Sequence, residues 1–221
     1  LVIASSLTAQ TLLDDFDGNG IANFNVQADG GNAVTSSSLT DIDSDGNLEL
    51  RVTNNPDVDG GFDTIMSFDV PRSGPVFDAL RNNTTIEFSR QAFTADNSGI
   101  GFINNHIVLQ SNAWSSVPRD SGGNFRTLNG SAQSLNPNAD VTDLYSFDYT
   151  TSADDVYGVL DAYAGGAGTF MNLFVIQQST DNGPEATIYY DDFMAVPEPS
   201  TYAAILGLLG LGLVFWRRRM S

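Results

Sequence analysis

The chain has 221 residues, no Cys, one His and a formal net charge of −18 at pH 7, from 27 acidic and nine basic side chains. This charge argues against a nucleic-acid partner, because phosphate groups are bound by clustered Lys and Arg. The lack of Cys excludes disulfides, thiol nucleophiles and Cys-ligated metal centres. The acids are 23 Asp and only four Glu, and all nine bases are Arg. Since Glu and Lys favour helices whereas Asp, Asn, Gly and Ser favour turns, strands joined by turns are expected.

Residues 1–9 form a short, mostly apolar run that ends in the small residue Ala9. Secretory signals have an apolar segment followed by a small residue at the cleavage point. We therefore expect 1–9 to be the last part of a signal peptide. A buried first strand is the alternative.

The segment 10–195 contains short runs typical of strands and no long stretch of helical periodicity. Residues 47–53 and 84–90 alternate apolar and polar side chains, as strands with one buried face do. Clusters of Gly, Asn, Asp and Pro, which favour turns, separate the runs. This spacing predicts one all-β domain, a two-sheet jelly-roll-like sandwich. The other strand candidates are 62–70, 106–110, 144–149, 172–177 and 186–195.

The first and last candidate strands of this domain carry acids at their ends, in 12–17 and 186–193. This bracket is similar to the galactose-binding-like jelly rolls of many carbohydrate-binding modules. The resemblance implies that the first and last strands lie side by side and that their acids hold a structural calcium ion. The implied ligands are Asp15, Asp17, Asp191 and Asp192.

Two acidic loops also have the spacing of calcium-binding turns. Residues 41–46 place acids at alternate positions with Gly at the sixth, and 15–20 repeat the pattern with Asn at the fifth. Calcium prefers six to eight oxygen ligands, but the twelfth position holds Val in both loops, so neither is a complete EF-hand. We expect calcium at one or both regions, with solvated acidic turns as the alternative. The acids of the first loop are Asp41, Asp43 and Asp45.

Groups suited to catalysis are sparse. His106 lies in a strand candidate without a motif for a nucleophile, a zinc ligand or a phosphate. Glycosidases use two carboxyl groups at a set separation, often Glu, but the Glu residues of the domain are widely separated in sequence. We therefore expect no enzymatic activity, although a polysaccharide hydrolase or lyase stays open as the less favoured alternative.

Sugar binding would need an aromatic platform beside polar groups, because a sugar ring stacks its C–H face on an aromatic ring. Trp114 lies in the polar loop 111–116, where an exposed ring would be costly without a use. Tyr157 and Tyr163 flank another loop. These three are the candidate sugar-binding residues, and packing in the core or at its rim is the alternative.

The uncharged stretch 203–216 is followed at once by Arg217, Arg218 and Arg219. As a helix, its fourteen residues would span about 21 Å, short of the ~30 Å hydrocarbon core of a membrane. An Arg cluster stays on the cytoplasmic side, which places the upstream chain outside. We therefore expect one short C-terminal transmembrane helix.

Pro197, Glu198 and Pro199 stand just before this stretch. The order of a Pro-Glu-Pro motif, a short Gly- and Leu-rich helix and an Arg cluster resembles the PEP-CTERM sorting tail of Gram-negative bacteria. That resemblance implies an exosortase as partner, which recognises the tail and cuts near the motif. We therefore expect 196–221 to be a sorting tail, with an ordinary membrane anchor as the alternative.

Together these features predict an exported cell-envelope or extracellular-matrix protein, sorted by an exosortase. Its β-sandwich would bind or organise extracellular polysaccharide without catalysis, with calcium as a structural clip. A structural matrix or adhesion protein without a sugar site is the main alternative.

Overall fold

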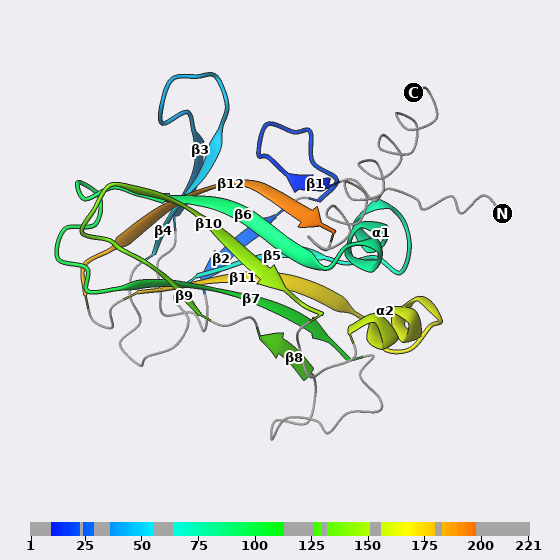
Figure 1. Ribbon diagram of the computed structural model, residues 1–221. Helices are drawn as coiled ribbons and strands as arrows, with labels where there is room; N and C mark the ends of the chain where they lie inside the picture. The colour runs from blue at the N-terminus through cyan, green and yellow to red at the C-terminus, as the bar shows by residue number, and fades with distance from the viewer. Residues whose placement is uncertain are drawn as a thin grey trace, which may run out of the picture.

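The computed structural model describes residues 10–22, 24–28, 36–54, 64–112, 126–129, 132–150, 156–179 and 183–197. Within these residues, two antiparallel sheets pack into a two-layer sandwich (Figure 1). The strands of sheet A are β1 (Thr11–Asp14), β3 (Ser36–Thr40), β4 (Glu49–Asn54), β6 (Thr85–Ala92), β10 (Val141–Asp148) and β12 (Ala186–Val196). The strands of sheet B are β2 (Asn25–Ala28), β5 (Thr64–Asp69), β7 (Ile103–Ser111), β8 (Arg126–Asn129), β9 (Gln133–Leu135) and β11 (Met171–Ser179). The predicted all-β, two-sheet sandwich is confirmed.

Sheet A has the strand order β10-β6-β12-β4-β3, and sheet B has the order β2-β5-β11-β7-β8 with β9 also paired to β7. Along one edge of β12, β4 pairs with residues 186–190 and β1 pairs with residues 193–195. The first and last strands therefore lie side by side, as the jelly-roll resemblance implied. Asp191 and Asp192 lie between these two paired stretches.

Alternation of side chains explains why these segments form a sandwich. In β11, Met171, Leu173 and Val175 are buried between the sheets, whereas Asn172 and Phe174 face outward and are partly exposed. This period of two is the signature of a strand with one face on the core. The core also holds stacked aromatic rings, which add directional contacts to the burial of apolar area. Its central rings are those of Phe88, Tyr145, Tyr190 and Phe193.

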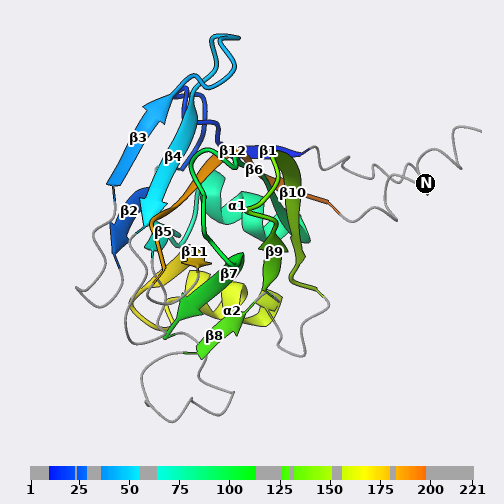
Figure 2. The same cartoon turned by 90° about the vertical axis from the view of Figure 1, so that its left-hand side faces the viewer.

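Two short helices close one end of the sandwich, at the right in Figure 1; Figure 2 turns that end away from the viewer and shows them behind the two layers. Helix α1 (Pro75–Asn82) follows Gly74, whose φ of 100° favours glycine, and begins with Pro at its first position. Helix α2 is Val156–Ala164. Neither was predicted from the sequence, because eight or nine residues give too few turns for a clear helical period.

The last strand reaches one residue beyond the expected domain boundary at 195. Val196 is only 8% exposed, and its carbonyl oxygen accepts a hydrogen bond from the backbone N–H of Thr84 at 3.0 Å. Residues 1–9, Trp114, Glu198, Pro199 and the arginines 217–219 lie outside the described residues, as does the expected helix over 203–216. Within the described ranges, no helix is long and apolar enough to cross a membrane.

Candidate functional site

Glu49 and Asp191 lie next to each other on the outer face of sheet A. The strands β4 and β12 pair with Leu50 opposite Tyr190, and Glu49 and Asp191 are the next residues along each strand. A register shift between Asp191 and Met194 marks a β-bulge in β12. A bulge re-aims side chains that regular alternation would send to opposite faces.

This bulge keeps two successive acids away from the core. Tyr190 and Phe193 are both fully buried, whereas Asp191 is partly exposed and Asp192 is exposed. In a regular strand Asp192 would point inward with Tyr190, because side chains alternate. Asp192 has a φ of 51°, in the left-handed region that is uncommon for residues other than Gly and that Asp and Asn adopt more readily than most.

The loop 15–20 brings a third acid to this place. Asp17 Oδ1 accepts a hydrogen bond from the backbone N–H of Leu48 at 3.0 Å, which holds the loop against the start of β4. The ring of Phe16 packs edge-on against Phe193, with centroids 5.8 Å apart, and anchors the loop to the core. Two loops that look like separate acidic turns in the sequence therefore lie together.

The carboxyl groups gathered here interact electrostatically. Burial raises the pKa of Asp191 to about 7, and the negative charges of Asp192, Glu49 and Asp17 raise it as well. Burial also raises the pKa of Glu49, which is 4% exposed. We call this group of four the acidic cluster: Asp17, Glu49, Asp191 and Asp192.

Glu49 was not among the sequence candidates, although it links the acidic cluster to the Asp41 loop. Its Oε2 accepts a hydrogen bond from the backbone N–H of Ile42 at 3.1 Å, and the charges of Asp43 and Asp41 act on it. The sequence does hold a signal that could have identified Glu49 as a candidate: it occupies an outward-facing position in the alternating run 47–53. What the sequence could not supply was that this strand lies beside the last one.

In the Asp41 loop, the structure brings Asp41, Asp43 and Asp45 together, with one carboxylate oxygen of each within 4.8 Å of the others. All three are exposed and accept backbone hydrogen bonds within the loop. Asp41, for example, accepts from the N–H groups of Ser44 and Gly46 at 2.6 and 3.1 Å. These bonds are those of a self-contained acidic turn, so the geometry agrees with the solvated-turn alternative as well as with a cation site.

Asp15 has a local role in its own turn. It accepts hydrogen bonds from the side chain of Asn19 at 2.8 Å and from the backbone of Asp17 and Asn19. The side-chain bond from Asn19 is the main reason why the pKa of Asp15 is lowered. Asp15 therefore shapes the loop that presents Asp17 to the acidic cluster.

The outer face of sheet B carries apolar side chains on its central strands. Phe174 of β11 lies opposite Val108 of β7, and Ile176 lies opposite His106 on one side and Ile65 of β5 on the other. These residues alternate with the inward-facing ones, so they point away from the core between the sheets. Phe174 and Ile65 are partly exposed, whereas Val108 and Ile176 are only 6% and 4% exposed. Together these five residues form what we call the apolar band.

Polar side chains border the apolar band. Asn104 lies opposite Gln178, and its Oδ1 accepts a hydrogen bond from the hydroxyl of Ser134 at 2.7 Å. The side chain of Gln178 is hydrogen-bonded to His106. Burial lowers the pKa of His106, so its imidazole is uncharged at neutral pH. The face thus offers uncharged donors and acceptors beside apolar surface.

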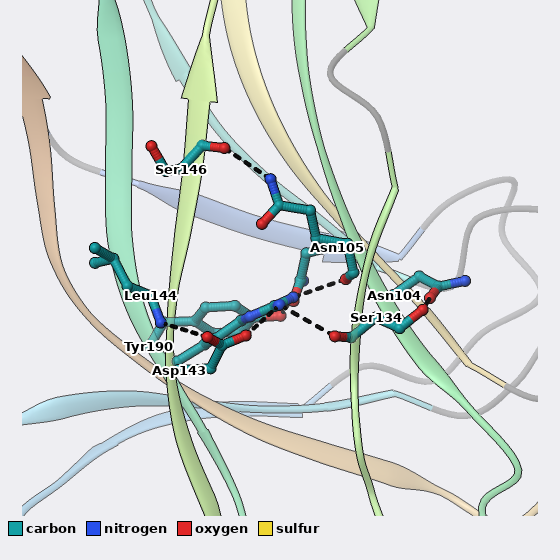
Figure 3. Close-up of polar contacts among 9 residues, drawn as sticks. Asn104, Asn105, Ser134, Asp143, Leu144, Ser146 and Tyr190 are labelled. Atoms are coloured by element: carbon teal, nitrogen blue, oxygen red, sulfur yellow. Dashed lines mark hydrogen bonds and ion pairs between the residues drawn. The ribbon is translucent and has the colours of Figure 1, made fainter.

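A buried polar network supports the strands of this face from inside (Figure 3). Arg90 of β6 is 1% exposed and donates to Asn105 of β7 at 3.0 Å, to the carbonyl of Gln133 at 2.8 Å and to Asp143 of β10 at 2.7 Å. Asn105 in turn donates to the hydroxyl of Tyr190 at 2.7 Å. The network joins both sheets and sets β9 beside β7, which positions Ser134.

The structure places the two tyrosines of the sugar-binding prediction on helix α2. Tyr163 is 5% exposed, its hydroxyl donates to the carbonyl of Val70, and the guanidinium of Arg72 lies 4.4 Å from its ring centroid. Tyr157 is partly buried, and its hydroxyl donates to the carbonyl of Asn83 at 2.7 Å. Both rings fix helix α2 against its neighbours. A sugar platform needs an open ring face, which buried Tyr163 does not present.

Comparison with solved structures places the fold among carbohydrate-binding modules. The CBM27-1 module of Caldicellulosiruptor saccharolyticus, solved with mannohexaose, has a TM-score of 0.53 at 14% identity, over 86% of this chain and 98% of that one. The family 11 module of a cellulosomal cellulase of Clostridium thermocellum has a TM-score of 0.50 at 13% identity, over 87% and 97%. A carbohydrate-binding-module structure of the β-sandwich superfamily has a TM-score of 0.49 at 15% identity; the match covers 85% of this chain but only 62% of that one.

The protein is therefore a two-sheet β-sandwich with the fold of the CBM27-1 and family 11 modules. A family model of the PEP-CTERM protein-sorting motif matches residues 195–219, which confirms the resemblance seen in the tail. The motif indicates export and sorting to the cell envelope or extracellular space. No curated protein matched the chain. The matched residues begin inside β12, because Ala195 and Val196 belong to both.

Proposed function

We propose that this protein is an exported, non-catalytic carbohydrate-binding sandwich whose glycan lies along the outer face of sheet B. The observation that carries the proposal is the apolar band with its polar border. Phe174 and Ile65 offer partly exposed apolar surface beside the polar groups of Asn104 and Ser134. A sugar ring has the matching chemistry, with C–H faces that bind apolar surface and hydroxyl groups that both donate and accept hydrogen bonds.

The charge of this face favours a neutral glycan. His106 is uncharged at neutral pH, and its neighbours in the apolar band carry no charge. The chain as a whole carries a net charge of −18, which repels anionic polymers. The fold supports the same proposal, because one similar module was solved with a neutral oligosaccharide, mannohexaose. Trp114 stays a predicted contributor from the loop that follows β7.

Binding to a panel of neutral and acidic glycans, followed by titration calorimetry of the full-length protein, tests the proposal. Phe174→Ala should weaken binding of a neutral oligosaccharide by about tenfold or more, because it removes much of the exposed apolar surface of the apolar band. The control is Leu144→Ala, which removes a 52% exposed apolar side chain from the outer face of sheet A. Lack of binding to every glycan, or equal loss in both variants, would favour the alternative of a matrix or adhesion protein without a sugar site.

An exosortase is the proposed processing partner, supported by the sorting motif over 195–219. The expected order is export, a stop in the inner membrane through the apolar stretch 203–216, and cleavage near Pro197. Processing would then free the sandwich for the cell envelope or the extracellular matrix. A polysaccharide-binding domain at that location could organise extracellular polysaccharide.

A structural calcium ion at the acidic cluster is a separate proposal. Glu49 and Asp191 adjoin each other on paired strands, and Asp17 and Asp192 act on Asp191 electrostatically. Like charges on adjoining strands destabilise the folded chain unless protons or a cation neutralise them. Carboxylates from a loop and two strands are the hard oxygen ligands that calcium takes. Bound there, the ion would join the loop after β1 to β4 and β12.

A further inference from the structure

A cavity of about 600 Å³ lies beyond the apolar band, where the end of β5 and the start of β11 meet both helices. This volume is within the range of small-molecule sites in proteins. Its walls come from the segment before β2, the end of β5, the start of α1 and the segment that leads into β11. Apolar wall residues include Ile21, Val70 and Phe170, and the polar ones are Asp69, Thr169 and Asn172.

The outer face of sheet B leads directly to this cavity. Phe174 lies opposite Ser67, and two residues further along the same strands Asn172 lies opposite Asp69. Because side chains two apart share a face, Asn172 and Asp69 lie in the same outward rows as the apolar band. They also line the cavity. A glycan that lies along β11 would therefore pass from Phe174 to the Asn172–Asp69 pair and reach the cavity.

The polar groups of the cavity are held in place before any ligand arrives. With its amide oriented to satisfy both neighbours, Asn172 donates to Asp69 Oδ1 and to the carbonyl of Met171, each at 2.8 Å. Asn112 Oδ1 accepts from the backbone N–H of Thr169 at 2.7 Å, which fixes the wall segment. Groups positioned in advance cost less ordering entropy on binding.

Among the described residues that line the cavity, Asp69 is the one with a formal charge, which disfavours anions there. The nearby Arg72 is engaged elsewhere, because its guanidinium donates to the carbonyls of Tyr163, Ala167 and Gly168. A carboxylate beside an amide and apolar walls suits vicinal hydroxyl groups, which can donate to the second carboxylate oxygen of Asp69 and to the amide oxygen of Asn172.

The cavity is bounded by both helices, since Val76 of α1 and Tyr163 of α2 line it. From this position we infer that the cavity takes the terminal sugar of a neutral glycan, so that the protein binds chain ends and not internal stretches. This inference rests on the proposed glycan-binding face of sheet B. It also gives the orientation of the bound glycan: the glycan lies along β11, and its terminal sugar occupies the cavity beside the helices.

If the protein binds chain ends, the amount of protein that a polysaccharide binds at saturation should depend on its number of chain ends. Soluble β-mannan, mixed-linkage β-glucan and xylan serve as probes, each before and after limited cleavage by an endo-acting hydrolase. The amount of full-length protein bound per gram at saturation should rise in proportion to the number of chain ends. Capacity that stays constant while binding persists would overturn the chain-end inference and leave the glycan-binding face intact. Failure of all probes, with a negative glycan panel, would overturn both.

A matched pair of variants locates the effect. Asp69→Ala should weaken binding to the cleaved polysaccharide by about tenfold, because hydrogen bonds to a charged group are lost. Asp78→Ala removes the same charge from an exposed position on α1 that does not line the cavity, and should leave binding unchanged. If the two variants bind equally well, the cavity is not the end-binding site. Thermal unfolding of both variants checks that they are folded.

Discussion

Glu49 and Asp191 lie on paired strands, one position beyond the Leu50–Tyr190 pair, and burial raises the pKa of both carboxyl groups. The two residues are 142 positions apart in the sequence, yet they adjoin at the place where β12 passes from β4 to β1. Their proximity makes the charge state of the acidic cluster part of the stability of the fold.

Without divalent cations, the protein should become less stable as the pH rises from 5 to 8. The folded-state pKa of Asp191, about 7, lies above its ordinary value of 3.8, so the folded protein holds this proton more tightly than the unfolded chain. The resulting stabilisation is complete below about pH 4 and is lost as the pH rises through 7. Asp191→Asn should flatten the decline in Tm and raise Tm at pH 8. Asp140→Asn is the control, because hydrogen bonds from Thr94 lower the pKa of Asp140 and place its titration below this window. If Tm still declines between pH 5 and 8 in Asp191→Asn, the decline comes from other titratable groups.

Calcium should raise Tm by several degrees more than NaCl of the same ionic strength. An ion bound only by the folded state stabilises it by about 2.7 kcal/mol at a hundredfold excess over its Kd. The double variant Asp191→Asn, Asp192→Asn should abolish this increment. Thermal unfolding at millimolar calcium gives the measurement.

The matched variant for that experiment is Asp43→Asn combined with Asp45→Asn, which removes two charges from the Asp41 loop. If this pair keeps the calcium increment, the ion belongs to the acidic cluster. If only this double variant loses the calcium-dependent rise in Tm, the ion binds in the Asp41 loop. If calcium raises Tm no more than NaCl does, the protein has no structural calcium site.

Arg90→Ala should destabilise the fold more than Arg81→Ala. Arg90 is 1% exposed, and its loss leaves the amide oxygen of fully buried Asn105 without this donor, which costs about 1–3 kcal/mol; Asp143 is 44% exposed and can be solvated. Arg81 forms an ion pair with Asp161 at 2.8 Å, but both side chains are exposed, so its loss costs about 0–1 kcal/mol. Equilibrium unfolding in urea measures both. Similar values for the two arginines would mean that the buried network adds little.

Replacing Pro197, Glu198 and Pro199 by Ala should block processing of the exported protein. An immunoblot of cell fractions from an exosortase-containing host should show the unprocessed form retained in the inner membrane. Pro184→Ala, in the turn before β12, should mature normally. The C-terminus of the mature protein, read by mass spectrometry, should lie after Val196, because cleavage within β12 would remove buried residues. Normal maturation of the triple variant would refute the role of the motif.

Local patterns in the sequence were enough to predict most of the longer strands and the tail, whereas the short strands β2, β3, β8 and β9 were not among the candidates. The alternating runs 47–53 and 84–90 correspond to β4 (Glu49–Asn54) and β6 (Thr85–Ala92). Alternation reports the environment of the two faces of a strand, so each segment carries the signal by itself. The sorting motif is likewise a contiguous string of residues, and the family model matches it at 195–219.

The tertiary structure decided which polar residues act together. Arg90 continues the inward row of Ile86 and Phe88, a position that its charge alone would have assigned to solvent. Its burial is possible only because Asp143, Asn105 and a carbonyl group from other strands converge on it. In the same way, Glu49 joins Asp191 through the pairing of β4 with β12. Strand periodicity is a local property of the chain, whereas these partners depend on which distant strands pair, and packing of the whole core selects that pairing.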